Sequence, residues 1–157
     1  ETAAVWGPWT FQAEYDGTWI KDATTLTPTP IDRGTPFFHG GYVQVLYFLT
    51  GEHTIYNRRT GVFEGTIPLE NAFCVRNGDH TCHGSGAWQL GARYNAIDLN
   101  DNGINGGILN SFTLGINWYW TPNARVQFNY DLTHRSQVKT VEPGDINSFG
   151  TRFSYFF

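Results

Sequence analysis

Apolar and polar residues alternate along much of this chain. Six segments follow a period of two, which places apolar side chains on one face and polar side chains on the other. Each is about ten residues long, the length at which a tilted strand crosses the apolar core of a bilayer. They cover residues 9–16, 41–50, 87–97, 111–120, 124–133 and 148–157. The pattern predicts an all-β chain of about six antiparallel strands, the last of which ends at Phe157.

One of these segments is less regular than the others. Within residues 41–50, the side chains of Tyr42, Leu46 and Phe48 fall on the face that is otherwise polar. The connection that follows, residues 51–86, is too long for a simple turn and contains the turn signal Thr-Gly. We expect this connection to contain a further short hairpin.

The remaining connections and the aromatic residues favour a membrane protein. Residues 121–123 read Thr-Pro-Asn and predict a tight turn, whereas residues 98–110 and 134–147 predict long polar loops. Transmembrane barrels have short turns on the periplasmic side and long loops outside. Aromatic residues such as Trp118 and Trp120 cluster at strand ends, as in the interfacial girdles of such barrels. The sequence therefore predicts an antiparallel transmembrane β-barrel, with a soluble β-sandwich as the alternative fold.

Composition agrees with this prediction and excludes one class of partner. Charged residues form 15% of the 157 residues, below the roughly 25% usual in soluble domains, and aromatic residues form 17%. No apolar run approaches the roughly 18 residues that a membrane helix requires. The net charge of −4 gives no basic surface for nucleic acid. We expect one domain, residues 1–157, with no nucleic-acid partner.

Two cysteines, Cys74 and Cys82, lie in the polar stretch CVRNGDHTC. An even number of closely spaced cysteines suits a disulfide in an oxidising compartment. Free thiols remain an alternative, as does a zinc site completed by His80 or His83, although the spacing lacks the usual Cys-x2-Cys pair. We expect the disulfide.

Several longer stretches resemble a known family. GGYVQVLYFLTGEH, YNRRTGVFEGTIP, GAWQLGARYNAIDLNDNGINGG, FTLGINWYWTPNARVQFNYD and GDINSFGTRFSYFF are similar, in this order and spacing, to the C-terminal part of the phosphate-selective porin O and P family. The resemblance covers about residues 40–157. It implies a barrel of sixteen strands, a homotrimer in the bacterial outer membrane, and passage of small anions such as phosphate. Because six strands are too few to close a barrel, the chain is expected to be the C-terminal portion of a larger one.

Residues on the polar face are the candidates for lining a pore. Three cations and three anions are among them, and we expect these charges to pair across the wall rather than to form an anion filter. The predicted pore-lining residues are Arg93, Arg125, Arg152, Glu14, Asp16, Asp131, Gln127 and Asn129.

Two further sites are predicted outside the polar face. Phe153, Tyr155 and Phe157 resemble the C-terminal signal by which barrel-assembly machinery recognises outer-membrane proteins. Asp98, Asn100 and Asn102 begin like a calcium loop, but the twelfth position is Leu109 instead of glutamate. We therefore treat these three residues as a weak calcium candidate.

The sequence leads to three hypotheses about function. The first is a passive outer-membrane porin for small solutes, surrounded by outer-membrane lipid. The second is a porin-like barrel with a structural or anchoring role in an envelope complex, and the third is a secreted β-sandwich that binds carbohydrate. No nucleophile elbow and no His-Glu metal motif occurs in the sequence, so we expect neither an enzyme nor a cofactor.

Overall fold

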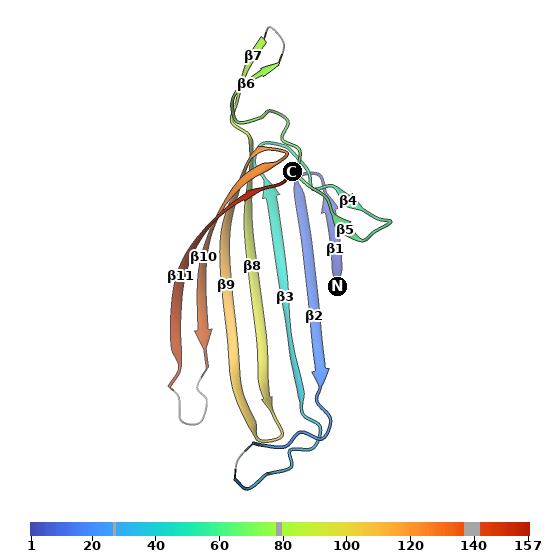
Figure 1. The fold of residues 1–157 in the computed structure, drawn as a ribbon, viewed down its shortest axis with the longest axis vertical. Helices are drawn as coiled ribbons and strands as arrows, with labels where there is room; N and C mark the ends of the chain where they lie inside the picture. Colours follow the sequence, from blue (N-terminus) through green and yellow to red (C-terminus); the bar gives the residue numbers. More distant parts are fainter. Residues whose placement is uncertain (27, 78–79, 137–141) are drawn as a thin grey trace.

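The computed structural model describes residues 1–26, 28–77, 80–136 and 142–157, without the side chains of residues 74–77 and 80–83. Its main element is a seven-stranded antiparallel sheet in which every strand pairs with its neighbour in the order β1-β2-β3-β8-β9-β10-β11 (Figure 1). The strands are β1 (Thr2–Trp6), β2 (Trp9–Trp19), β3 (Phe37–Phe48), β8 (Ala87–Asp101), β9 (Ile104–Thr121), β10 (Ala124–Arg135) and β11 (Gly144–Tyr155). No described helix is long and apolar enough to cross a membrane.

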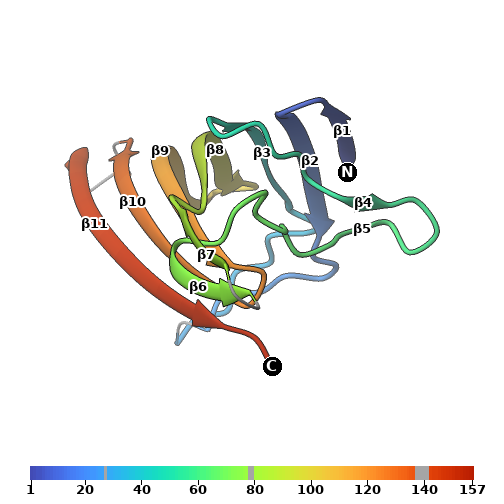
Figure 2. The ribbon, with the colours of Figure 1, turned by 90° about the horizontal axis from the view of Figure 1, so that it is seen from above.

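The sheet is curved and open. Seen from above, its strands form an arc that runs from β1 to β11, and these two strands are its edges (Figure 2). The arc has a concave and a convex side, and side chains alternate between the two along each strand. The predicted all-β antiparallel fold is confirmed, although these residues alone do not close a barrel.

All six predicted segments lie largely within strands of this sheet, but the predicted strand number was wrong. β1 was missed because only five residues, TAAVW, form it, and its two central alanines give no alternation of apolar and polar side chains. The end of the last strand also differs from the prediction. β11 ends at Tyr155, and the amide of Phe156 donates a hydrogen bond of 2.8 Å to the Asn123 carbonyl.

Residues 98–110 were predicted to be a long loop, and this was wrong. β8 and β9 continue through this region and are joined by a two-residue turn at Asn102 and Gly103. Both turn residues have positive φ, 46° and 74°, as in the type I′ turn that Asn-Gly favours in tight hairpins. The polar residues that suggested a loop therefore lie on a hairpin extension of the sheet.

The connection between β3 and β8 contains two short hairpins, where one was predicted. β4 (Tyr56–Asn57) pairs with β5 (Val62–Phe63), and β6 (Phe73–Asn77) pairs with β7 (His80–Gly84). This connection lies at the same end of the sheet as the 121–123 turn and the C-terminus, which we call the C-terminal end (Figure 1).

The convex face is apolar and has no second layer against it among the described residues. Its side chains are partly exposed along the length of the sheet, as for Val43, Leu114 and Phe149. The buried apolar cluster is small and consists of Phe48, Ala87 and Tyr119, near the C-terminal end. A soluble sandwich would bury one face of each sheet against the other, whereas the apolar side chains of this face are partly exposed.

Candidate functional site

The concave face carries a connected layer of polar side chains. Near the C-terminal end, Gln127 Nε2 donates to Asn117 Oδ1 at 2.8 Å, and Asn117 Nδ2 donates to Gln89 Oε1 at 2.8 Å. The hydroxyl of Tyr119 donates to the same Gln89 oxygen at 3.2 Å. These bonds join β8, β9 and β10 through side chains as well as through the backbone. Each amide is oriented by its neighbours. Since these side chains are neutral, this part of the face is polar without being charged.

The strand registers place all eight predicted pore-lining residues on this concave face. Residues directly opposite each other in neighbouring strands share a face, and so do residues two apart in one strand. One row across the sheet runs Gln44, Arg93, Thr113, Asp131. The same reasoning puts the full set on this face: Arg93, Arg125, Arg152, Glu14, Asp16, Asp131, Gln127 and Asn129.

These charges do not pair across the wall in the part of the chain that the structure describes, contrary to the prediction. Arg93 Nε donates to Asn95 Oδ1 at 2.6 Å, and its guanidinium carbon lies 3.7 Å from the centre of the Tyr42 ring. Asp131 accepts a hydrogen bond from the hydroxyl of Thr113. Since Thr113 lies between them on β9, Arg93 and Asp131 are two strand spacings apart, roughly 10 Å. At this separation the two charged groups do not form an ion pair, and each contacts neutral side chains instead.

The connection between β3 and β8 lies against the C-terminal end of the concave face. The hydroxyl of Thr54 is 2.6 Å from that of Thr10, which is buried on β2. Farther along, residues 63–66 line a hollow together with Tyr119, Arg125 and Phe156. The connection thus reaches both the β2 side and the β10 side of the arc (Figure 2). We call residues 49–72 the arm.

Two charged residues line this hollow, Glu64 from the arm and Arg125 from β10. Arg125 contacts two of its rings. Its guanidinium carbon is 5.8 Å from the centre of the Tyr119 ring and 5.5 Å from that of Phe156, distances at which a cation and a ring attract each other. Its Nε is buried and has no hydrogen-bond partner among the described residues. Sequence reasoning identified Arg125 but missed Phe156, because Phe156 lies beyond the last strand and does not follow its alternation.

The convex face carries an aromatic cluster at the C-terminal end. The rings of Trp88 and Trp118 stack with centroids 4.8 Å apart, and Trp120 contacts Trp118 at 5.3 Å. Trp118 Nε1 donates to the Ser85 carbonyl at 2.7 Å, and Phe73 adds a ring 5.4 Å from Trp120. Rings with a bound polar edge are typical of the lipid interface.

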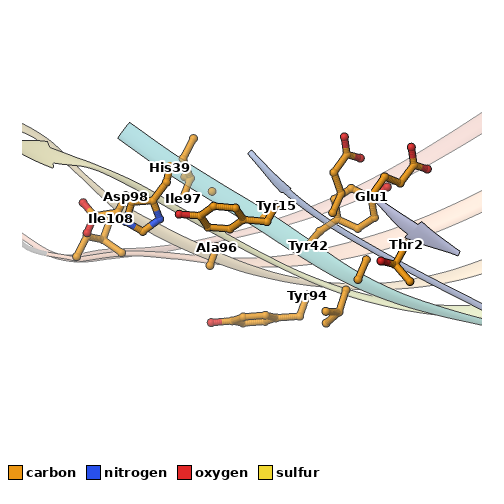
Figure 3. Close-up of a pocket in the computed structure, with 15 residues that line it drawn as sticks. Glu1, Thr2, Tyr15, His39, Tyr42, Tyr94, Ala96, Ile97, Asp98 and Ile108 are labelled. Carbon is orange, nitrogen blue, oxygen red and sulfur yellow. The ribbon is translucent and has the colours of Figure 1, made fainter. Parts of the chain in front are cut away.

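A hollow on the convex side lies nearer the opposite end of the sheet. The strand register places Gly41 between Tyr15 and Ala96. The small side chain of Ala96 leaves space between the larger side chains of Tyr15 and Tyr94 (Figure 3). His39 and Asp98 face each other across β3 and β8 at one end. Because this hollow belongs mainly to the apolar side of the sheet, we do not assign it to the polar wall.

The weak calcium candidate is not a calcium loop in this fold. Asp98 Oδ1 accepts from the Asn100 amide at 2.8 Å, and Asn100 Oδ1 accepts from the Gly107 amide at 2.9 Å. Asn102 forms the hairpin turn. The side-chain oxygens of Asp98 and Asn100 therefore accept hydrogen bonds from backbone amides where the pairing of β8 and β9 is irregular. Among the described residues, no group of three acidic, histidine or cysteine side chains is placed to hold a metal.

The other predicted residues lie at the C-terminal end. Phe153 and Tyr155 are exposed on the convex side of β11, and Phe157 follows the strand and is fully exposed. The backbone register of β6 and β7 places Cys74 opposite His83 and Val75 opposite Cys82. The side chains of both cysteines lie outside the described part of the structure, so the disulfide stays a prediction.

Comparison with known proteins identifies the family. The sequence profile described as phosphate-selective porin O and P matches residues 1–157, the whole chain. An uncharacterized protein of Caulobacter vibrioides is 33% identical over 161 residues, which cover 100% of this chain and 29% of that relative. The chain thus spans less than a third of the relative's length. Together with the curved antiparallel sheet and its polar concave face, the match shows that the chain belongs to the phosphate-selective porin O and P family.

Proposed function

We propose that the chain forms the C-terminal part of an outer-membrane porin, a water-filled channel through which small solutes diffuse passively. The observation that carries this proposal is the division of the sheet into an exposed apolar convex face and a hydrogen-bonded polar concave face. Such a wall suits lipid on one side and water on the other. Membership of a porin family implies a channel rather than an enzyme.

Further strands are needed to complete the wall. β1 and β11 are edges of the sheet, and an unpaired edge in lipid leaves backbone groups without hydrogen bonds. We propose that residues outside this chain pair with both edges and close the barrel. The sixteen strands and the homotrimer implied by the family belong to the same proposal, as does assembly by the barrel-assembly machinery.

We propose small hydrophilic solutes, anions included, as the substrates. The charged residues assigned to the pore wall have mixed signs, three arginines against three carboxylates. Their partners are neutral side chains or aromatic rings where the structure gives them, as for Arg93 and Asp131. A wall of this kind favours weak ion selectivity over tight binding of one anion.

The experiment is a planar-bilayer recording of the complete protein that contains this chain. Stepwise conductance increases on addition of purified protein support a porin, and a salt gradient then gives the ion preference from the reversal potential. Correctly folded protein that inserts into bilayers without conductance would contradict the channel and favour the anchoring role.

Single charge changes on the concave face should shift the ion preference in opposite directions. We expect Arg93→Gln to move the reversal potential towards cation preference and Asp131→Asn to move it towards anion preference. A charge about 6 Å from a passing ion in water changes its energy by about 0.7 kcal/mol, or roughly threefold in relative permeability. Arg59→Gln, at the exposed tip of the β4–β5 hairpin, is the matched control. Reversal potentials that are identical for all three variants would show that Arg93 and Asp131 do not line the pore.

A further inference from the structure

Glu52 is a buried carboxylate just after β3, and the proposed channel gives it no role. Only 4% of its surface is exposed, although it lies in a connection between strands. Its Oε2 accepts a hydrogen bond from the hydroxyl of Thr50, and its Oε1 accepts one from the Leu69 amide at 3.1 Å. No ion pair involves it among the described residues. A carboxylate buried without a cation carries a desolvation cost, so its hydrogen bonds must offset that cost.

These bonds join three parts of the chain that are distant in sequence. Thr50 belongs to the first residues of the arm, and Leu69 lies near its end. The hydroxyl oxygen of Thr50 also accepts a hydrogen bond from the Trp88 amide at 3.0 Å, which links the group to the second residue of β8. Through these hydrogen bonds, Glu52 and Thr50 connect the start of the arm to its end and to β8. Hydrogen bonds to a charged acceptor are roughly twice as strong as neutral ones.

The arm between these two fastened ends lies against the concave face. Thr54 contacts Thr10 on β2 through their hydroxyls, and residues 63–66 face Tyr119 and Arg125 across the hollow. Thr66 is itself buried. In the view along the strands, the β4–β5 hairpin projects past the β1 edge, whereas the rest of the arm lies inside the arc (Figure 2). It therefore occupies part of the space that the wall would enclose at the C-terminal end.

We propose that Glu52 and Thr50 form a clasp that holds the arm in the C-terminal mouth of the channel, so that Glu52 is a positioning residue that limits conductance. The inference rests on the proposed channel function. In the docked state the arm narrows the mouth. When the clasp is lost, only the Thr54–Thr10 contact and the packing of residues 63–66 keep the arm in place. The arm then leaves the mouth more often, and the mouth widens.

The test records single channels of the complete protein with Glu52→Ala and Glu52→Gln. Alanine removes both acceptors, and glutamine keeps the size but loses the charge and one acceptor. Loss of a hydrogen bond to a charged group shifts an equilibrium by about tenfold or more, so we expect long-lived openings to a higher conductance level. The shift should be larger for alanine than for glutamine. If alanine prevents assembly, the nearly isosteric glutamine variant decides the outcome.

A reversible cross-link separates a positioning role from a general loss of stability. Thr10→Cys with Thr54→Cys places two thiols where hydroxyls now lie 2.6 Å apart, in a background in which Cys74 and Cys82 are serine. Under oxidising conditions this disulfide should return the Glu52→Ala channel to the wild-type level, and a reducing agent should restore the higher level. A channel altered by a disturbed barrel would not respond in this way.

Glu70→Ala is the matched control, because Glu70 is an exposed carboxylate of the same arm. It should conduct like the wild type. Three outcomes separate the hypotheses. Wild-type protein without conductance contradicts the channel itself, whereas conducting Glu52 variants with the wild-type level overturn the clasp alone. A higher level that the cross-link does not reverse also overturns it.

Discussion

Replacing Leu114 with arginine should strongly destabilise the protein when it is folded in a bilayer. Leu114 lies in the middle of β9 on the convex face, 50% exposed, opposite Ala92 on β8 and Tyr130 on β10. If this face meets lipid, arginine there costs about 2–4 kcal/mol near the bilayer midplane. Urea titration of the protein refolded in lipid vesicles should show this loss of unfolding free energy.

The control is Thr113→Arg, one residue earlier on the same strand. Thr113 faces the concave side, where its hydroxyl contacts Asp131. The arginine would replace one hydrogen bond and lie beside a carboxylate in water, so we expect a loss below about 1 kcal/mol. If both faces of the sheet met water, the two variants would show no such contrast. Equal losses for both variants, or a larger loss for Thr113→Arg, would show that the convex face does not meet lipid.

Deleting Phe157 should abolish assembly into the outer membrane while leaving the intrinsic stability of the fold nearly unchanged. Phe157 lies beyond β11 and is fully exposed, so its removal takes away little packing. Its expected role, with Tyr155 and Phe153, is recognition by the assembly machinery. The measurement compares the amount of complete protein in the outer-membrane fraction of cells with the yield of refolding into vesicles without machinery.

Phe156→Ala is the matched control for this deletion. Phe156 is held by backbone and side-chain bonds to Asn123, and its ring lies 5.5 Å from the Arg125 guanidinium. Its loss should weaken local packing but leave the terminal phenylalanine in place. We therefore expect Phe156→Ala to reach the membrane. Normal cellular assembly without Phe157 would exclude the signal, and failed refolding in vesicles would make Phe157 a structural residue instead.

The alternation of residues predicted the sheet well because it reflects a physical requirement of each strand. In β10, Val126 and Phe128 face one side, and Gln127 and Asn129 face the other. The same rule placed the residues predicted to line a pore on one face. It predicted the individual strand lengths less well, because Asn and Asp in residues 98–110 are typical of both loops and tight hairpins. Only the positive φ of Asn102 and Gly103 decides between the two.

The arm could not be predicted in the same way, because its contacts are tertiary. Phe48 disturbed the alternation of residues 41–50, and the structure gives the reason: it is buried beside Tyr119, where the arm begins. Glu52 resembled any polar loop residue until its burial and its bond to the Leu69 amide were known. The expected pairing of charges failed for a related reason. Charge signs can be read from a sequence, but the strand spacing that keeps Arg93 and Asp131 apart depends on the register.

The most direct test of the membrane wall is a cysteine scan along β10 of the complete protein, with Cys74 and Cys82 replaced by serine. Val126, Gln127, Phe128 and Asn129 are changed to cysteine one at a time, and the protein in vesicles is treated with a charged, membrane-impermeant thiol reagent. If the convex face meets lipid and the concave face meets water, we expect labelling at positions 127 and 129 and protection at positions 126 and 128. Uniform labelling of all four positions, or the reverse alternation, would contradict it.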